Sequence, residues 1–377
     1  MLQKFFATSI VLSFFVNGFS QEVAVSQTPP TKIDSVIAAP EEEKKPALSI
    51  TGGADVYYRY DFAKTRMNNL TSFTNSHNRF ELGMATVKLE HKTEKVGVVV
   101  DLGFGKRAQE FSYNDQGILA AIKQLYVSYS PAAFVKFTAG SWATHVGYEL
   151  VDANFNRNYS MSYMFTNGPF FHTGLKADFT AGKHGFMIGI ANPTDYKYVP
   201  DDAGNPVINK KAFLAQYSVG ISDNVKAYLN YVGSQAPLDS SKSSQFDLVL
   251  TGKVNDKFNI GFNGTINNMK FRQNNKYTDS ESWWASALYL NVDPTSAFGL
   301  TLRGEYFSDK NSIKMFNAFS GGGSIFATTL SANFKVHSFI IIPEFRYDNA
   351  SENIFFDKNL SAKSSAASFL IAAVYAF

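Results

Sequence analysis

The sequence predicts an all-β fold, a transmembrane up-and-down antiparallel β-barrel of about sixteen strands. Three observations indicate this fold. Short segments of alternating apolar and polar residues recur over residues 48–377, long and short connections alternate between them, and an export signal precedes them. After that signal no segment approaches the roughly 20 apolar residues of a spanning helix. A membrane-embedded form must therefore be a closed barrel, because lipid offers no hydrogen-bond partner to unpaired backbone N–H and C=O groups.

The N-terminus predicts export and then a linker. Lys4 precedes an apolar run over residues 5–16, and the small residues Gly18 and Ser20 predict cleavage after residue 20, so that 1–20 is a signal peptide. The run is too short for a comfortable membrane anchor. Residues 21–47 are rich in Pro, Ala and charge without periodicity, which predicts a flexible periplasmic linker. Cysteine is absent, which excludes disulfides, thiolate metal sites and lipid attachment at a cysteine.

The alternation is clear in the first strand of the barrel. Leu48, Ile50 and Val56 fall on one face, and Asp55 and Arg59 fall on the other. A half-buried helix would need a period of 3.6 residues, which these segments lack. We place strands at 48–61, 78–91, 95–106, 119–130, 134–141, 170–181, 185–192, 212–222, 225–234, 244–254, 258–268, 283–293, 298–308, 325–336, 339–348 and 366–377.

The connections between these strands alternate without exception. Short turns fall at 92–95, 131–133, 182–184, 223–224, 255–257, 294–297 and 337–338, and long loops at 62–77, 107–118, 142–169, 193–211, 235–243, 269–282, 309–324 and 349–365. Transmembrane barrels place short turns in the periplasm and long loops outside, so both termini are expected on the periplasmic side. The loop 142–169 is the longest. Its aromatic and Asn content predicts that it folds into the lumen, and an extracellular lid without a role in flux is the alternative.

Aromatic residues near strand ends favour a membrane barrel over a soluble sandwich, which would also alternate. They predict an interfacial girdle formed by Tyr57, Tyr58, Tyr60, Tyr126, Tyr129, Trp283, Trp284, Tyr306 and Phe307. The chain stops on Phe377 with apolar residues at alternate positions before it, which resembles the terminal strand that outer-membrane proteins present to their insertion machinery. We therefore expect localisation in the cell outer membrane, with its lipid and that machinery as partners.

The strand number predicts an aqueous lumen, since barrels of sixteen to eighteen strands are too wide for side chains to fill. Lys or Arg on a lipid face near the midplane would cost roughly 2–4 kcal/mol each, so such residues must face inward. The candidate pore-lining residues are Lys136, Lys176, Lys226, Arg303, Glu305, Glu344, Arg346 and Asp348. They form either a charged belt that sets the field across the pore or ion pairs that stiffen the wall. Pro343 lacks an N–H group, which predicts either a β-bulge or a locally open hydrogen bond there.

Several strand-end motifs carry a family resemblance. Leu-Arg-Gly-Glu-Tyr-Phe-Ser-Asp (302–309), Ile-Ile-Pro-Glu-Phe-Arg-Tyr-Asp (341–348), Gly-Ser-Trp (140–142) and Gly-Tyr-Glu (147–149) resemble the OmpL-like β-barrel porin family, over about residues 48–377. The resemblance implies a barrel, passive diffusion of small hydrophilic solutes, and no catalytic residues. The alternative is a non-conducting barrel that serves as a binding or structural surface protein.

The sequence predicts neither an enzyme nor a cofactor site. His145, Asp152 and Ser160 lie in one loop, but no nucleophile elbow surrounds Ser160. The six His residues lack metal-ligand spacing. The net charge of +3 is too small to argue for nucleic acid and no Lys/Arg-rich run supports it, so we expect no nucleic acid as a partner. The solute, the ion selectivity and the oligomeric state stay open.

Overall fold

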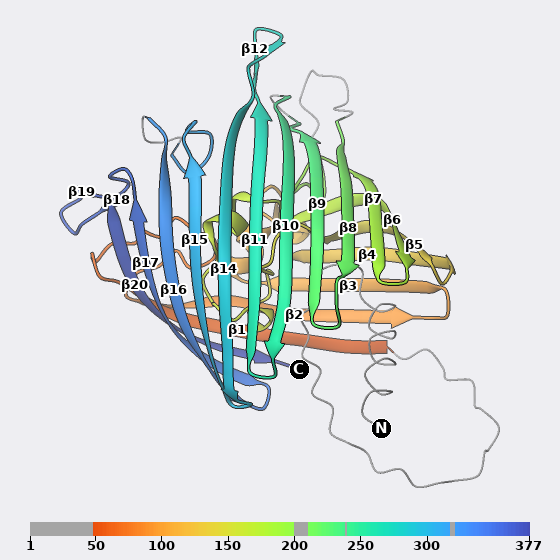
Figure 1. The fold of residues 1–377 in the computed structure, drawn as a ribbon, viewed down its shortest axis with the longest axis horizontal. Helices are drawn as coiled ribbons and strands as arrows, with labels where there is room; N and C mark the ends of the chain where they lie inside the picture. The colour runs from red at the N-terminus through yellow and green to blue at the C-terminus, as the bar shows by residue number, and fades with distance from the viewer. Residues whose placement is uncertain (1–47, 200–209, 238–239, 317–320) are drawn as a thin grey trace.

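Sixteen antiparallel strands form a closed barrel in the computed structural model, which describes residues 48–199, 210–237, 240–316 and 321–377 (Figure 1). Each strand pairs with its neighbours in chain order, and the last strand pairs with the first. The signal peptide predicted at 1–20 and the linker predicted at 21–47 lie outside the described residues. Within the described ranges, no helix is long and apolar enough to cross a membrane.

All sixteen predicted strands are present, with ends that differ by a few residues from those expected. The wall strands are β1 (Leu48–Asp61), β2 (Arg79–Lys92), β3 (Val96–Phe104), β4 (Ile122–Ala132), β5 (Val135–Ala143), β6 (Phe171–Ala181), β7 (His184–Ala191), β8 (Ala212–Gly220), β9 (Val225–Gln235), β10 (Lys242–Asn255), β11 (Phe258–Lys270), β14 (Glu281–Thr295), β15 (Phe298–Asp309), β16 (Gly323–Val336), β17 (Phe339–Ala350) and β20 (Ser365–Ala376). Two small hairpins, β12 (Arg272–Gln273) with β13 (Lys276–Tyr277) and β18 (Phe355–Phe356) with β19 (Ala362–Lys363), lie in long loops.

The wall is apolar outside and polar inside, as the alternation predicted. On β17, Phe345 and Tyr347 point outward and are 45% and 44% exposed. Their neighbours Glu344, Arg346 and Asp348 point inward and are at most 5% exposed. A soluble sandwich would bury the apolar face and expose the charges. The inverted pattern fits a wall that contacts lipid on its outer face.

Short turns lie at one rim of the barrel and long connections at the other (Figure 1). The chain ends at the rim of the short turns, where Gly52 and Phe377 exchange two backbone hydrogen bonds of 3.0 and 2.9 Å. Of the two alternatives predicted at Pro343, the structure shows a local opening and not a β-bulge. The β16–β17 ladder pairs Ser331 with Glu344 and Phe334 with Ile341, and it is interrupted between these pairs without a change of register.

The predicted aromatic girdle is only partly correct. Tyr129 and Trp284 are 49% and 43% exposed on the outer face. Four of the predicted girdle residues point inward instead: Tyr57, Tyr126, Trp283 and Phe307. The reason is that loop residues inside the barrel pack against these rings. An aromatic side chain on the inner face is therefore buried without contacting lipid. The Tyr57 ring, for example, lies 5.4 Å from that of Tyr159 in a loop.

The inside–outside assignment predicts a depth-dependent penalty on β16. Leu330→Arg places a guanidinium on the outer face near mid-strand and should lower the free energy of unfolding by about 2–4 kcal/mol. Val336→Arg, on the same face beside the turn at 337–338, should cost at most about 1 kcal/mol. Urea unfolding in detergent micelles or vesicles measures both. Equal penalties for the two variants would contradict the placement of β16 in the bilayer.

Candidate functional site

The candidate site is the segment 144–170, the lumen loop, which connects β5 to β6 and lies inside the barrel (Figure 1). This confirms the inward fold predicted for the loop at 142–169. The lumen loop contains two short helical turns, η2 (Ala153–Phe155) and α3 (Tyr163–Asn167). Ser162 caps α3, where its hydroxyl accepts a hydrogen bond of 3.0 Å from the Phe165 N–H.

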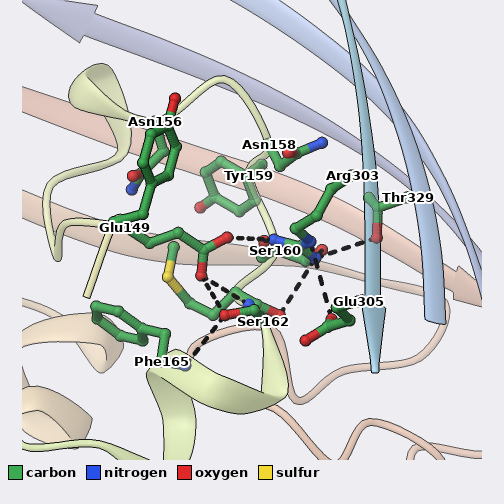
Figure 2. Close-up of polar contacts among 12 residues, drawn as sticks. Glu149, Asn156, Asn158, Tyr159, Ser160, Ser162, Phe165, Arg303, Glu305 and Thr329 are labelled. Carbon is green, nitrogen blue, oxygen red and sulfur yellow. Dashed lines mark hydrogen bonds and ion pairs between the residues drawn. The ribbon is translucent and has the colours of Figure 1, made fainter. Parts of the chain in front are cut away.

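Arg303 on β15 is the centre of the contacts that hold the lumen loop (Figure 2). Its Nη1 donates to a Glu149 carboxylate oxygen at 2.5 Å and to the Ser160 carbonyl at 2.7 Å. Its Nη2 donates to the Thr329 hydroxyl at 3.1 Å. The other Glu149 oxygen accepts from the N–H and the hydroxyl of Ser162 at 2.8 and 2.7 Å. Because Arg303 is fully buried, these partners replace the water that its charge would otherwise need.

Wall carboxylates also bind the backbone of the lumen loop. Glu344 on β17 accepts from the N–H groups of Tyr159 and Ser160 at 2.7 and 3.1 Å, and Glu305 accepts from the Tyr163 N–H at 2.8 Å. Arg346 donates to the Met161 carbonyl at 2.8 Å. An irregular loop inside a barrel has no ladder to satisfy its backbone groups. The charged side chains of β15 and β17 supply those partners.

A neighbouring part of the wall holds the beginning of the lumen loop. Asp247 on β10 accepts from the Gly147 N–H at 3.1 Å, and the Asn263 side chain on β11 accepts from the Tyr148 N–H at 3.0 Å. On a third side, Lys123 of β4 forms an ion pair of 2.6 Å with Asp152. The lumen loop is therefore attached to wall strands on several sides of the barrel.

The middle of the lumen is filled as a result. Each of the sixteen strands places at least one buried side chain on the inner face, in strand order Asp55, Met84, Asp101, Lys123, Thr138, Lys176, Met187, Gln216, Asn230, Asp247, Asn263, Tyr289, Arg303, Ser331, Glu344 and Leu370. In this conformation the lumen loop occupies a part of the lumen that would be open without it.

All eight candidate pore-lining residues lie on the inner face, but in three settings. Five of them, Arg303, Glu305, Glu344, Arg346 and Asp348, are buried beside the lumen loop. Lys136 and Lys176 line a small cavity of about 30 Å³ bounded by strands β4 to β8. Lys226 is exposed near the short turn that precedes β9. Glu305 lies 3.8 Å from Arg303 and 3.2 Å from Arg346, so these belt residues form ion pairs.

Sequence reasoning missed the partners in the lumen loop. Glu149 was noted only as part of a family motif, and the loop has no periodicity that assigns an inner or outer face. His145, Asp152 and Ser160 each contact a different group: His145 Nε2 lies 3.2 Å from the Tyr231 carbonyl, Asp152 pairs with Lys123, and Ser160 contacts Arg303. They hold no shared catalytic geometry. Among the described residues, no group of three or more His, Asp or Glu side chains is arranged to hold a metal ion.

Asp195 joins three loops at the rim of the long connections. One carboxylate oxygen accepts from the N–H groups of Phe170 and Phe171 at 2.7 and 3.0 Å, at the end of the lumen loop. The other accepts from the Tyr113 hydroxyl at 2.9 Å. Burial raises the pKa of the Asp195 carboxyl to about 6. A cavity of about 600 Å³ beside Asp195 is also lined by Lys314.

The closed sixteen-strand wall, the polar inner face and the inward loop define a porin-type outer-membrane β-barrel. The chain belongs to the family described as "Putative beta-barrel porin-2, OmpL-like", whose profile matches residues 47–377. Among curated proteins, no match was found.

Solved structures of similar fold include a porin and an outer-membrane protein. The anion-selective porin from Comamonas acidovorans superposes with a TM-score of 0.58 at 9% identity, covering 88% of this chain and 100% of that chain. Outer-membrane OmpT of Vibrio cholerae gives 0.55 at 12% identity, covering 89% and 99%. At these identities the similarity concerns the fold alone.

The anchoring contacts predict that Arg303 controls the order of the lumen loop. Arg303→Met leaves Glu149 buried without its partner, which costs about 3–5 kcal/mol. The Tyr159 and Ser160 amides should then exchange at least about a hundredfold faster, measured by hydrogen–deuterium exchange in micelles. Arg272→Met, in the exposed β12 hairpin, is the control and should leave exchange unchanged. Unchanged protection in a folded Arg303→Met barrel would show that Arg303 is dispensable for holding the loop.

The raised pKa of Asp195 predicts a pH dependence of stability. The folded carboxyl binds its proton more tightly than the unfolded one, whose pKa is near 3.8. Its contribution is therefore fully present below pH 4 and is lost as the pH rises through about 6. Asp195→Asn should flatten the stability curve between pH 4 and 6 by up to about 3 kcal/mol. Urea unfolding in micelles compares the two proteins, and parallel curves would contradict the expectation.

Proposed function

We propose that this barrel is an outer-membrane channel for small hydrophilic solutes and that the lumen loop sets the width of the passage. The inner face carries many buried charged and polar side chains, which a barrel that only anchors a surface protein does not require. The observation that best supports the proposal is the attachment of a separate segment across the lumen by charged side chains. A segment that is not part of the wall can narrow a wide lumen and can also move.

One observation favours a second candidate, a non-conducting barrel. Every wall strand has at least one buried side chain on its inner face, which favours a lumen that the lumen loop fills in this conformation. Such a barrel would serve as a binding or structural surface protein through its long loops. In the channel proposal the same observation implies that conduction requires a displacement of the lumen loop.

The proposal predicts stepwise conductance of the purified protein in a planar bilayer, which a crosslink should suppress. Asn158 in the lumen loop donates to Ser331 on β16 at 2.6 Å. The double variant Asn158→Cys/Ser331→Cys therefore introduces two neighbouring cysteines into a chain that has none. A short thiol-specific crosslinker should lower the open probability, and its reduction should restore it.

A matched control separates the crosslink from labelling itself. The single variant Asn158→Cys, treated in the same way, should keep the wild-type open probability. Full conductance of the crosslinked protein would show that solutes pass a static loop. A silent bilayer with wild-type protein, its folding verified by heat-modifiable gel migration, would support the non-conducting barrel.

A further inference from the structure

A small cavity inside the barrel lies apart from the contacts of Arg303. It is bounded by the inner faces of strands β4 to β8 and by the first residues of the lumen loop. Its volume is about 30 Å³, and a water molecule needs about 10–15 Å³ of such space. The polar side chains in its lining include Lys136, Thr138, Trp142, His145, Lys176 and Asp178. We call it the basic cavity.

Polar atoms without protein partners concentrate in the basic cavity. Among the described residues, the Thr138 hydroxyl, the Trp142 indole N–H and the free oxygen of Asp178 have no hydrogen-bond partner, although all three side chains are at least 95% buried. His145 Nδ1 and the Gln216 side-chain oxygen are in the same situation. A buried polar atom without a partner costs about 1–3 kcal/mol, so this concentration requires a polar guest.

The charges of the basic cavity favour an anion. Asp178 lies 3.4 Å from Lys176, and this pair neutralises one of the two ammonium groups. Lys136 faces Asp178 across the β5–β6 ladder and is outside that close contact, so two positive charges meet one negative charge. The Lys176 ammonium lies 5.6 Å from the Trp142 ring centre, which brings the indole to the same end of the cavity.

His145 contributes no charge. Its Nε2 faces the Tyr231 carbonyl at 3.2 Å, an arrangement that places the proton on Nε2 and leaves Nδ1 as an acceptor. Burial lowers the pKa of the His145 imidazole to about 4, so the ring is neutral at pH 7. The acceptors His145 Nδ1, Gln216 and Asp178 suit a water molecule, whereas the ammonium, indole and hydroxyl donors, together with the excess positive charge, favour a negatively charged guest.

We propose that the basic cavity binds one small inorganic anion of halide size, together with a water molecule. Lys136 and Lys176 supply the charge, and the Trp142 N–H and the Thr138 hydroxyl supply directed hydrogen bonds. The volume is about twice the 10–15 Å³ that one water molecule needs. The site is independent of conduction, because it is built from wall strands and the base of the lumen loop.

Chloride is the probe, and the line width of its chlorine-35 resonance reports binding to the full-length barrel in micelles. Wild-type protein should broaden the resonance, and excess bromide should reverse the broadening. Lys136→Gln/Lys176→Gln should abolish it. Lys226→Gln/Lys253→Gln removes the same charge from exposed inner-face positions near the short turns and should leave it intact. Heat-modifiable migration verifies that each variant is folded.

A second variant separates a directed site from charge alone. Trp142→Phe keeps the ring and both lysines but removes the N–H donor, and it should weaken chloride binding about tenfold. Equal broadening in wild type and both double variants, or equal loss in both double variants, would overturn the proposal and leave only water in the cavity. If the protein binds chloride but gives no conductance in a planar bilayer, the channel proposal is rejected and the anion site is retained.

Discussion

The absence of hydrogen-bonding partners in the hydrocarbon core of a membrane is the constraint on which this structure depends. A sheet in that setting must leave no open edge, and the pairing of β20 with β1 removes the last one. Once the ring is closed, the pleat determines the rest, because alternate side chains can only point to lipid or to the lumen. Phe345 and Glu344, adjacent in sequence, therefore lie in opposite environments.

The same constraint explains why the lumen is so highly charged. A ring of sixteen strands is too wide to be filled by its own side chains, and an irregular segment placed inside brings backbone groups that need partners. Arg303, Glu305 and Glu344 bind those groups, and Arg303 also pairs with Glu305 at 3.8 Å. Buried ion pairs add little net stability compared with apolar packing, but breaking one is costly. Their arrangement therefore fixes one position of the lumen loop more than it strengthens the wall.

The sequence predicted the wall well and the site poorly, for one physical reason. Period-two alternation is a local signal, so β1 and β17 are readable from their own residues, and the interruption at Pro343 follows from its missing N–H. The partner of Arg303 is not local: Glu149 lies in an aperiodic loop whose position depends on the whole barrel. For the same reason Tyr57 and Trp283 were placed in a lipid girdle. Their burial depends on the lumen loop, whose position is not determined by residues next to them in the sequence.

The attachment of Tyr159 has a consequence for how the barrel opens. Its hydroxyl binds Asp55 on β1 and its N–H binds Glu344 on β17, the two strands that flank β20. Leu370 of β20 packs in the same cluster. The lumen loop thus bridges, from within, the seam where the first and last strands meet. Strand separation at that seam must break these contacts as well as the ladder. Because these contacts must break before the seam separates, we expect them to slow unfolding of the barrel.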